Sequence, residues 1–141
     1  MNVLRIAYAS AAAFLACFVL GGLVFGLIPA FKTEFLKYPA VYRSQPGQMR
    51  FMPLGMAGML VAIVALATLY AMLALDGSGV VDGARFGALI GIFFVGAFVV
   101  HNYVNLNIGL RLTLQQAVAY FMEWLVVGVV IGLVYRPVLH S

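Results

Sequence analysis

Residues 113–135 have the sequence TLQQAVAYFMEWLVVGVVIGLVY, in which Glu123 is the one charged residue of an otherwise largely apolar run. A helix needs about 20 residues to cross a hydrocarbon core of about 30 Å, so this run predicts a transmembrane helix. Glu123 follows Thr113 by ten residues. At 1.5 Å per residue it lies about 15 Å along the helix, near the middle of the membrane.

Three more apolar runs precede this one, and they predict transmembrane helices at about residues 3–28, 51–75 and 83–107. The composition agrees, because 65% of the residues are hydrophobic and only 9% are charged, far from the balance of a soluble domain. Four such spans leave too few residues for a separate soluble domain. We therefore expect an all-α integral membrane protein, a bundle of four transmembrane helices that forms a single membrane domain over residues 1–141.

The segment 29–50 is the one long connection between the predicted spans. Pro29 ends the first span, because proline cannot continue a helix and restricts the residue before it. The rest of the segment mixes basic with aromatic side chains, a composition that suits the bilayer interface. We predict an interfacial loop here, and a short helix lying flat on the membrane fits it, although Pro39 and Pro46 interrupt the pattern. Residues 76–79, Asp-Gly-Ser-Gly, predict a tight turn after the second span.

Small residues recur in the spans, often four apart, and in lipid such residues let two helix backbones approach closely. The predicted packing positions are Gly22, Gly26, Gly87, Gly91, Gly128 and Gly132. A hairpin of the last two spans that turns near Arg111 would bring Gly91 close in height to Gly132. Packing within one chain is one interpretation, and a seam between two copies is the other, because the spacing is a permissive signal.

The same hairpin would bring His101 within about 3 Å in height of Glu123. A charged residue at mid-membrane costs at least about 2.5–3.5 kcal/mol on insertion scales, so Glu123 should face the bundle interior. The polar residues toward this end predict a ligand or proton pocket made of Glu123, His101, Asn102, Asn105, Gln116 and Tyr120. The alternative is structural: these side chains hold helices and loops together, and Gln116 completes a capping box that begins at Thr113.

Metal and cofactor chemistry has two candidates in the sequence. Met52, Met56 and Met59 share one face of the second span, and thioethers are soft ligands that suit Cu(I). Methionine also fills gaps in apolar packing, and no Cys or His in the flanking segment completes a site, so we predict no metal beyond this copper candidate. No cofactor is predicted for the chain alone. A haem or pigment ligated by His101 is expected only within a larger complex, because His140 lies beyond the opposite membrane face.

Several function classes have no support in the sequence. It contains no catalytic triad, phosphate-binding glycine loop, cysteine zinc cluster or CxxCH haem motif, so we do not expect an enzyme. The basic residues behind the net charge of +4 are scattered beside the apolar runs. They form no patch of the kind that binds nucleic acid, and lipid headgroups are their expected neighbours.

Over its whole length the hydropathy of the chain resembles that of small four-span bacterial membrane proteins of unassigned function. The resemblance implies a multi-pass protein of the bacterial inner (cytoplasmic) membrane. We expect it to act by association in the lipid bilayer, as an accessory subunit of a larger membrane complex with other membrane subunits, or with itself as a homodimer. The alternative is a small-molecule or proton-coupled carrier with a polar pocket around Glu123 and His101.

Overall fold

The computed structural model describes residues 2–73 and 79–135, and nearly all of them are helical. The elements are α1 (Val3–Gly21), η1 (Gly22–Leu27), α2 (Pro29–Leu36), α3 (Gln45–Met72), α4 (Gly79–Phe94), η2 (Val95–Val100), α5 (His101–Asn105) and α6 (Leu110–Val134). The two η segments are π-helical turns that continue α1 and α4 without a break. This part of the chain contains no strand.

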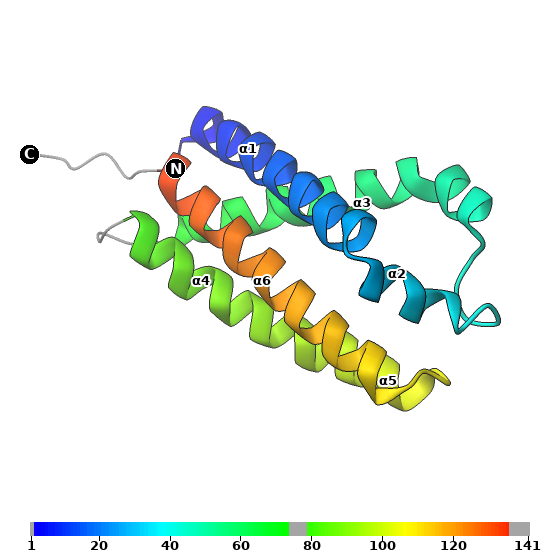
Figure 1. The fold of residues 1–141 in the computed structure, drawn as a ribbon. Coiled ribbons are helices and arrows are strands. Elements are labelled where there is room, and N and C mark those ends of the chain that lie inside the picture. Colours follow the sequence, from blue (N-terminus) through cyan, green and yellow to red (C-terminus); the bar gives the residue numbers. More distant parts are fainter. Residues whose placement is uncertain (1, 74–78, 136–141) are drawn as a thin grey trace, which may run out of the picture.

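Four helices are long and apolar enough to cross a membrane. They are Val3–Leu27, Gln45–Met72, Gly79–Asn105 and Leu110–Val134. The predicted fold class, an all-α membrane protein with four transmembrane helices, is confirmed. The first residues of α1 and the last of α6 lie at one end of the molecule (Figure 1), where the backbone N–H of Asn2 donates to the Tyr135 hydroxyl at 3.5 Å.

Proline positions explain two of the helix ends. Ile28, just before Pro29, has extended backbone angles (φ −88°, ψ 107°), so the first span stops where predicted and α2 begins afresh with Pro29 in its first turn. The short helix expected in the loop is therefore present. The second span was predicted from residue 51 but begins at Gln45. Pro46 does not interrupt this helix, because proline is tolerated in a first turn, where its missing N–H would have no partner.

The boundaries of the last two spans differ from the prediction for local reasons. The predicted turn at 76–79 lies almost wholly outside the described residues, and α4 is already helical at Gly79. The fourth span begins at Leu110 with Gly109 as its N-cap, so the predicted capping box at Thr113 is wrong. The Thr113 hydroxyl donates instead to the Gly109 carbonyl, one turn back in the same helix, at 3.2 Å.

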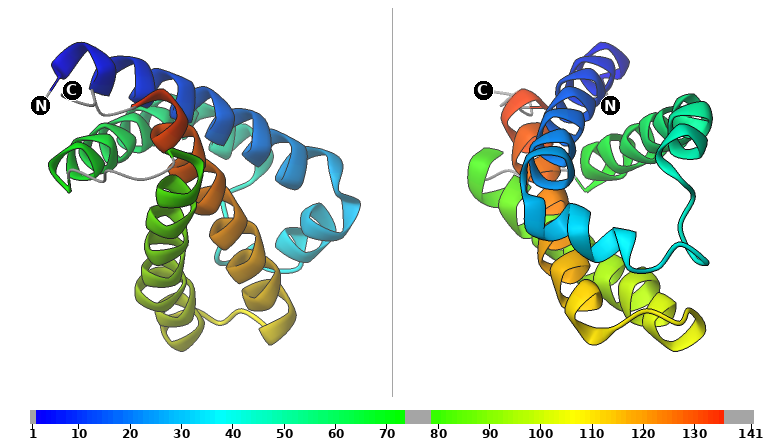
Figure 2. Two further views of the ribbon diagram at one scale, coloured as in Figure 1. Left: turned by 90° about the vertical axis from the view of Figure 1, so that its left-hand side faces the viewer. Right: turned by 45° about the vertical axis from the view of Figure 1, so that its right-hand side comes forward.

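Helices α4 and α6 run side by side along their length (Figures 1 and 2) and form the tightest interface of the chain. A Cβ atom on Gly83 would lie 2.5 Å from the Gly128 carbonyl oxygen, and one on Gly87 would lie 2.6 Å from that of Trp124. Only glycine permits this approach, and the close backbone contact supplies the van der Waals attraction that the hydrophobic effect cannot supply in lipid. The predicted glycine-packed hairpin is present.

The predicted register of this hairpin is wrong. Gly91 lies against Phe121 rather than near Gly132. The prediction placed the turn at Arg111, whereas the connection between the two helices is residues 106–109. Because the turn comes earlier in the chain, each residue of α4 faces a residue of α6 with a lower number than expected.

Gly22 and Gly26 were also predicted to pack, yet both are exposed in η1. A Cβ atom added to either would meet nothing within 4 Å. Packing of these two glycines within one chain is therefore wrong. Their contact with a second chain stays a prediction.

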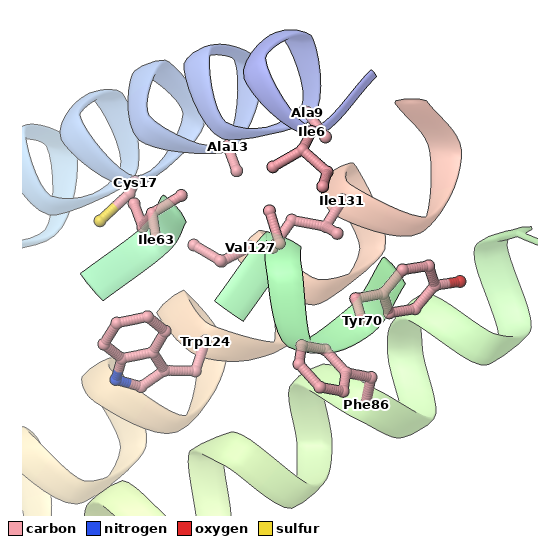
Figure 3. Packing of buried hydrophobic residues seen from close by; sticks show 11 residues of the cluster. Ile6, Ala9, Ala13, Cys17, Ile63, Tyr70, Phe86, Trp124, Val127 and Ile131 are labelled. Carbon is pink, nitrogen blue, oxygen red and sulfur yellow. The ribbon is translucent and has the colours of Figure 1, made fainter. Parts of the chain in front are cut away.

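A hydrophobic core cluster joins α1, α3, α4 and α6, and Figure 3 shows it closely. Its contributions from α3 are Ile63, Ala67 and Tyr70, the three buried residues of that helix. All three lie in the C-terminal half of α3. The N-terminal half extends away from the other helices in Figure 1 and in the right-hand view of Figure 2, so the buried contacts of α3 lie toward its C-terminal end.

Candidate functional site

Glu123, the most informative residue of the sequence, faces α1. Its side chain is 7% exposed, and its Oε1 accepts a hydrogen bond from the Cys17 thiol at 3.1 Å. A Cβ atom on Gly21 would lie 3.3 Å from the same oxygen, so the small residue at that position leaves room for the carboxyl group. The expectation that Glu123 faces the protein rather than lipid agrees with this geometry.

His101 does not meet Glu123. Gly91 lies against Phe121, and the two helices run in opposite directions. His101 is ten residues after Gly91, so it is level with a residue about ten before Phe121, which is Arg111. Glu123 is twelve residues further along α6, or about 18 Å. The His101 side chain is exposed, and the Asn105 amide donates to the His101 backbone carbonyl at 2.8 Å, within one helix. Asn102 lies on the same short helix, and no hydrogen bond joins it to Glu123 among the described residues.

Gln116 and Tyr120 lie on α6, and both contact residues of other elements. Gln116 Nε2 donates to the Tyr42 hydroxyl at 3.1 Å. The Tyr120 ring packs against Phe25 and Phe94, with ring centroids 5.8 and 5.1 Å away. Of the other five predicted pocket residues, Tyr120 lies one helical turn from Glu123 on α6, and the structure shows no contact of Glu123 with His101, Asn102, Asn105 or Gln116 among the described residues.

The interfacial segment is anchored to the start of α6 by contacts that sequence reasoning missed. Glu34 of α2 is buried at 3% exposure, and its Oε1 pairs with Lys37 Nζ at 2.6 Å and with Arg111 Nε at 3.3 Å. The Tyr38 hydroxyl accepts the Gly109 N–H at 2.9 Å. The sequence did offer one signal, because Glu34 is the one acidic residue in a segment with several basic residues. A buried carboxylate needs a cation or hydrogen-bond donor beside it.

A groove opens between α1 and the N-terminal half of α3, and Glu123 lines it. The groove is largely open and has a volume of about 300 Å³, the lower end of the range for small-molecule sites. Its lining residues are Phe14, Cys17, Phe18, Gly21, Gln48, Met52, Gly55, Met56, Met59 and Glu123. The three methionines of the predicted copper candidate therefore share one groove with Cys17, which comes from a different helix.

The side chains that most often bind metal ions form no cluster in residues 2–73 and 79–135. No group of three or more His, Cys, Asp or Glu side chains there is placed to hold a metal ion.

These features define a class: a small multi-pass membrane protein with a glycine-packed hairpin, and a loosely held α3 that leaves a groove beside a buried glutamate. The chain belongs to the DUF1761 family of proteins of unknown function, whose family model matches residues 8–132. That match includes part of each of the four spans. No curated protein and no solved structure matches the chain.

Proposed function

We propose that the protein acts by association within the membrane, through the outward face of α3, as a homodimer or as an accessory subunit of a larger membrane complex. The observation that carries this proposal is the poor packing of α3 against its own chain. Its N-terminal 18 residues, 45–62, contribute no buried side chain. A long apolar helix held at one end has most of its surface free for a partner.

The outward face of α3 has the chemistry of a helix-helix contact. Gly58, Ala62 and Ala65 are spaced by four and three residues and are all exposed. A Cβ atom on Gly58 would meet nothing within 4 Å, so this backbone is open to close approach. In the α4–α6 hairpin the same chain packs two helices through small residues, and this is the usual device in lipid.

This face adjoins the groove on one side, because the lining residue Gly55 lies three residues before Gly58 on the same side of α3. At about 100° per residue, the face of Gly58, Ala62 and Ala65 lies about a third of a turn around the helix from the face that carries Met52 and Met56.

Cross-linking tests the face directly, because the chain has a single cysteine. In a Cys17→Ala background, a short bismaleimide should link two copies of an Ala62→Cys variant in native membranes. The matched control is Ala57→Cys, an exposed alanine of the same helix on a different face. Links at both positions or at neither would overturn this face as the contact between copies.

A second candidate is a small-molecule or proton-coupled carrier, and the position of Glu123 in a groove favours it. A carrier that uses this carboxyl group should lose proton flux into dye-loaded liposomes in a Glu123→Gln variant that folds normally. Equal flux through both proteins would remove this candidate.

Two further expectations belong to the same proposal. The membrane is proposed to be the cytoplasmic membrane of a bacterium. A haem or pigment is proposed only between His101 and another subunit, and the exposure of that side chain leaves it within reach of a partner.

A further inference from the structure

Four sulfur-containing side chains line the groove between α1 and α3: those of Cys17, Met52, Met56 and Met59. We propose that this groove is a Cu(I) site, with the thioethers of Met52, Met56 and Met59 and the thiol of Cys17 as ligands. The proposal goes beyond association and does not depend on it.

The methionines are arranged as ligands of one site. Met52, Met56 and Met59 lie at i, i+4 and i+7 of α3, on one face, and all three line the groove. Each side chain has three rotatable bonds, so the sulfur atoms can converge on an ion from these positions. Met52 is 48% exposed. Met52 therefore borders open space, whereas Met59 also packs against the core cluster.

Cys17 supplies what the methionines lack, a ligand that can carry negative charge. Its side chain is 3% exposed and lies at one end of the core cluster, next to Ile63 of α3 (Figure 3). On binding, the S–H bond breaks, the proton is released to the aqueous medium, and the sulfur lone pair forms the Cu–S bond. Copper stays Cu(I) throughout. The ion and the thiolate neutralise each other, which matters where an uncompensated charge is costly.

The donor set selects the metal. Zn²⁺ sites use Cys, His and carboxylates, and Ca²⁺ and Mg²⁺ take oxygen ligands. The described residues offer no group of three such side chains. Thioethers with a thiolate are soft ligands, and Cu(I) is the common biological ion that prefers them.

The test is Cu(I) binding by the full chain, purified in detergent without oxygen and titrated with Cu(I) against the chromophoric chelator bicinchoninate. The wild type should bind one Cu(I) per chain, and X-ray absorption should place only sulfur atoms next to the metal. A Met52→Leu, Met56→Leu, Met59→Leu triple variant keeps the side-chain volume. It should bind at least about tenfold more weakly, since even outer partners of metal sites contribute 10–100-fold.

The matched control is a Met49→Leu, Met72→Leu double variant, which changes two exposed methionines of α3 that do not line the groove. It should bind like the wild type, and circular dichroism should show equal helix content in all variants. Cys17→Ser should weaken binding as the triple variant does. Absence of Cu(I) binding, nitrogen or oxygen ligands at the copper, or equal affinity of the triple variant and the wild type would each overturn the proposal.

Discussion

Gly83 and Gly128 face each other so closely that a Cβ atom on Gly83 would lie 2.5 Å from the Gly128 carbonyl oxygen. The obstacle is backbone, which cannot move aside as a flexible side chain can. This pair therefore fixes the distance between α4 and α6, the helix that carries Glu123.

Gly83→Ala should destabilise the protein by about 1–3 kcal/mol, the usual cost of overpacking, because the helices must separate. The free energy of unfolding in mixed micelles of detergent and SDS measures this. The control is Gly96→Ala in the same span, where an added Cβ meets nothing within 4 Å. Gly96→Ala should be neutral or stabilising by up to about 1 kcal/mol. Equal losses in both variants would contradict the close approach.

Tyr38→Phe should loosen the connection before α6. The substitution removes the acceptor of the Gly109 N–H, a loss of about 1 kcal/mol for a typical hydrogen bond. Amide hydrogen exchange of a peptide that covers residues 106–109 should become several-fold faster. Tyr103→Phe, a change at an exposed tyrosine of α5, should leave that rate unaltered. Identical exchange in the two variants would mean that Tyr38 does not hold the connection.

Glu34→Gln should release α2 from the start of α6. Glu34 is buried and pairs with two cations, Lys37 and Arg111, whereas glutamine keeps the shape and loses the charge. Chymotrypsin should then cleave the aromatic segment 31–42 several-fold faster than in the wild type. Lys32→Gln changes one charge on the same helix at an exposed position and should not affect cleavage. The anchor would be refuted by wild-type cleavage rates in Glu34→Gln.

Gly55→Phe should fill the groove without a clash, because a Cβ atom at this lining position meets nothing within 4 Å. Cys17 is the only cysteine of the chain, so its alkylation by N-ethylmaleimide reports access through the groove. The rate should fall several-fold in Gly55→Phe and remain unchanged in Ala57→Phe, a change at an exposed residue on a different face of α3 that does not line the groove. If Gly55→Phe left the alkylation rate as it is, Cys17 would not be reached by this route.

The sequence predicted the four spans to within six residues at each end, because hydropathy and length are enough to define a membrane helix. The end of the first span at Pro29 was also predicted correctly, because proline restricts the backbone of the preceding residue, Ile28, by local steric clash. Pro46 was misjudged, because its effect depends on where a helix begins, and the apolar run alone does not mark that point.

Register and side-chain partners could not be predicted in the same way. Nothing local distinguished a turn at Arg111 from one at residues 106–109, and the shift separates His101 from Glu123. Cys17 and Glu123 are 106 positions apart and lie on the first and last spans. Their contact follows from how non-consecutive helices pack, and a hairpin argument covers only neighbours in sequence. For the same reason the sequence did not predict that Cys17 of the first span would share a groove with the methionines of α3.

Association within the membrane is tested most directly by the composition of single native-membrane discs. The tagged chain, expressed at low level, is extracted with its surrounding lipid by a styrene–maleic acid polymer, and the polypeptides in each disc are counted by mass photometry and mass spectrometry. The account predicts discs that hold a second polypeptide, either another copy or a different subunit, and loss of that partner in Ala62→Leu but not in Ala57→Leu. Discs that hold one chain alone, in wild type and variants, would contradict it.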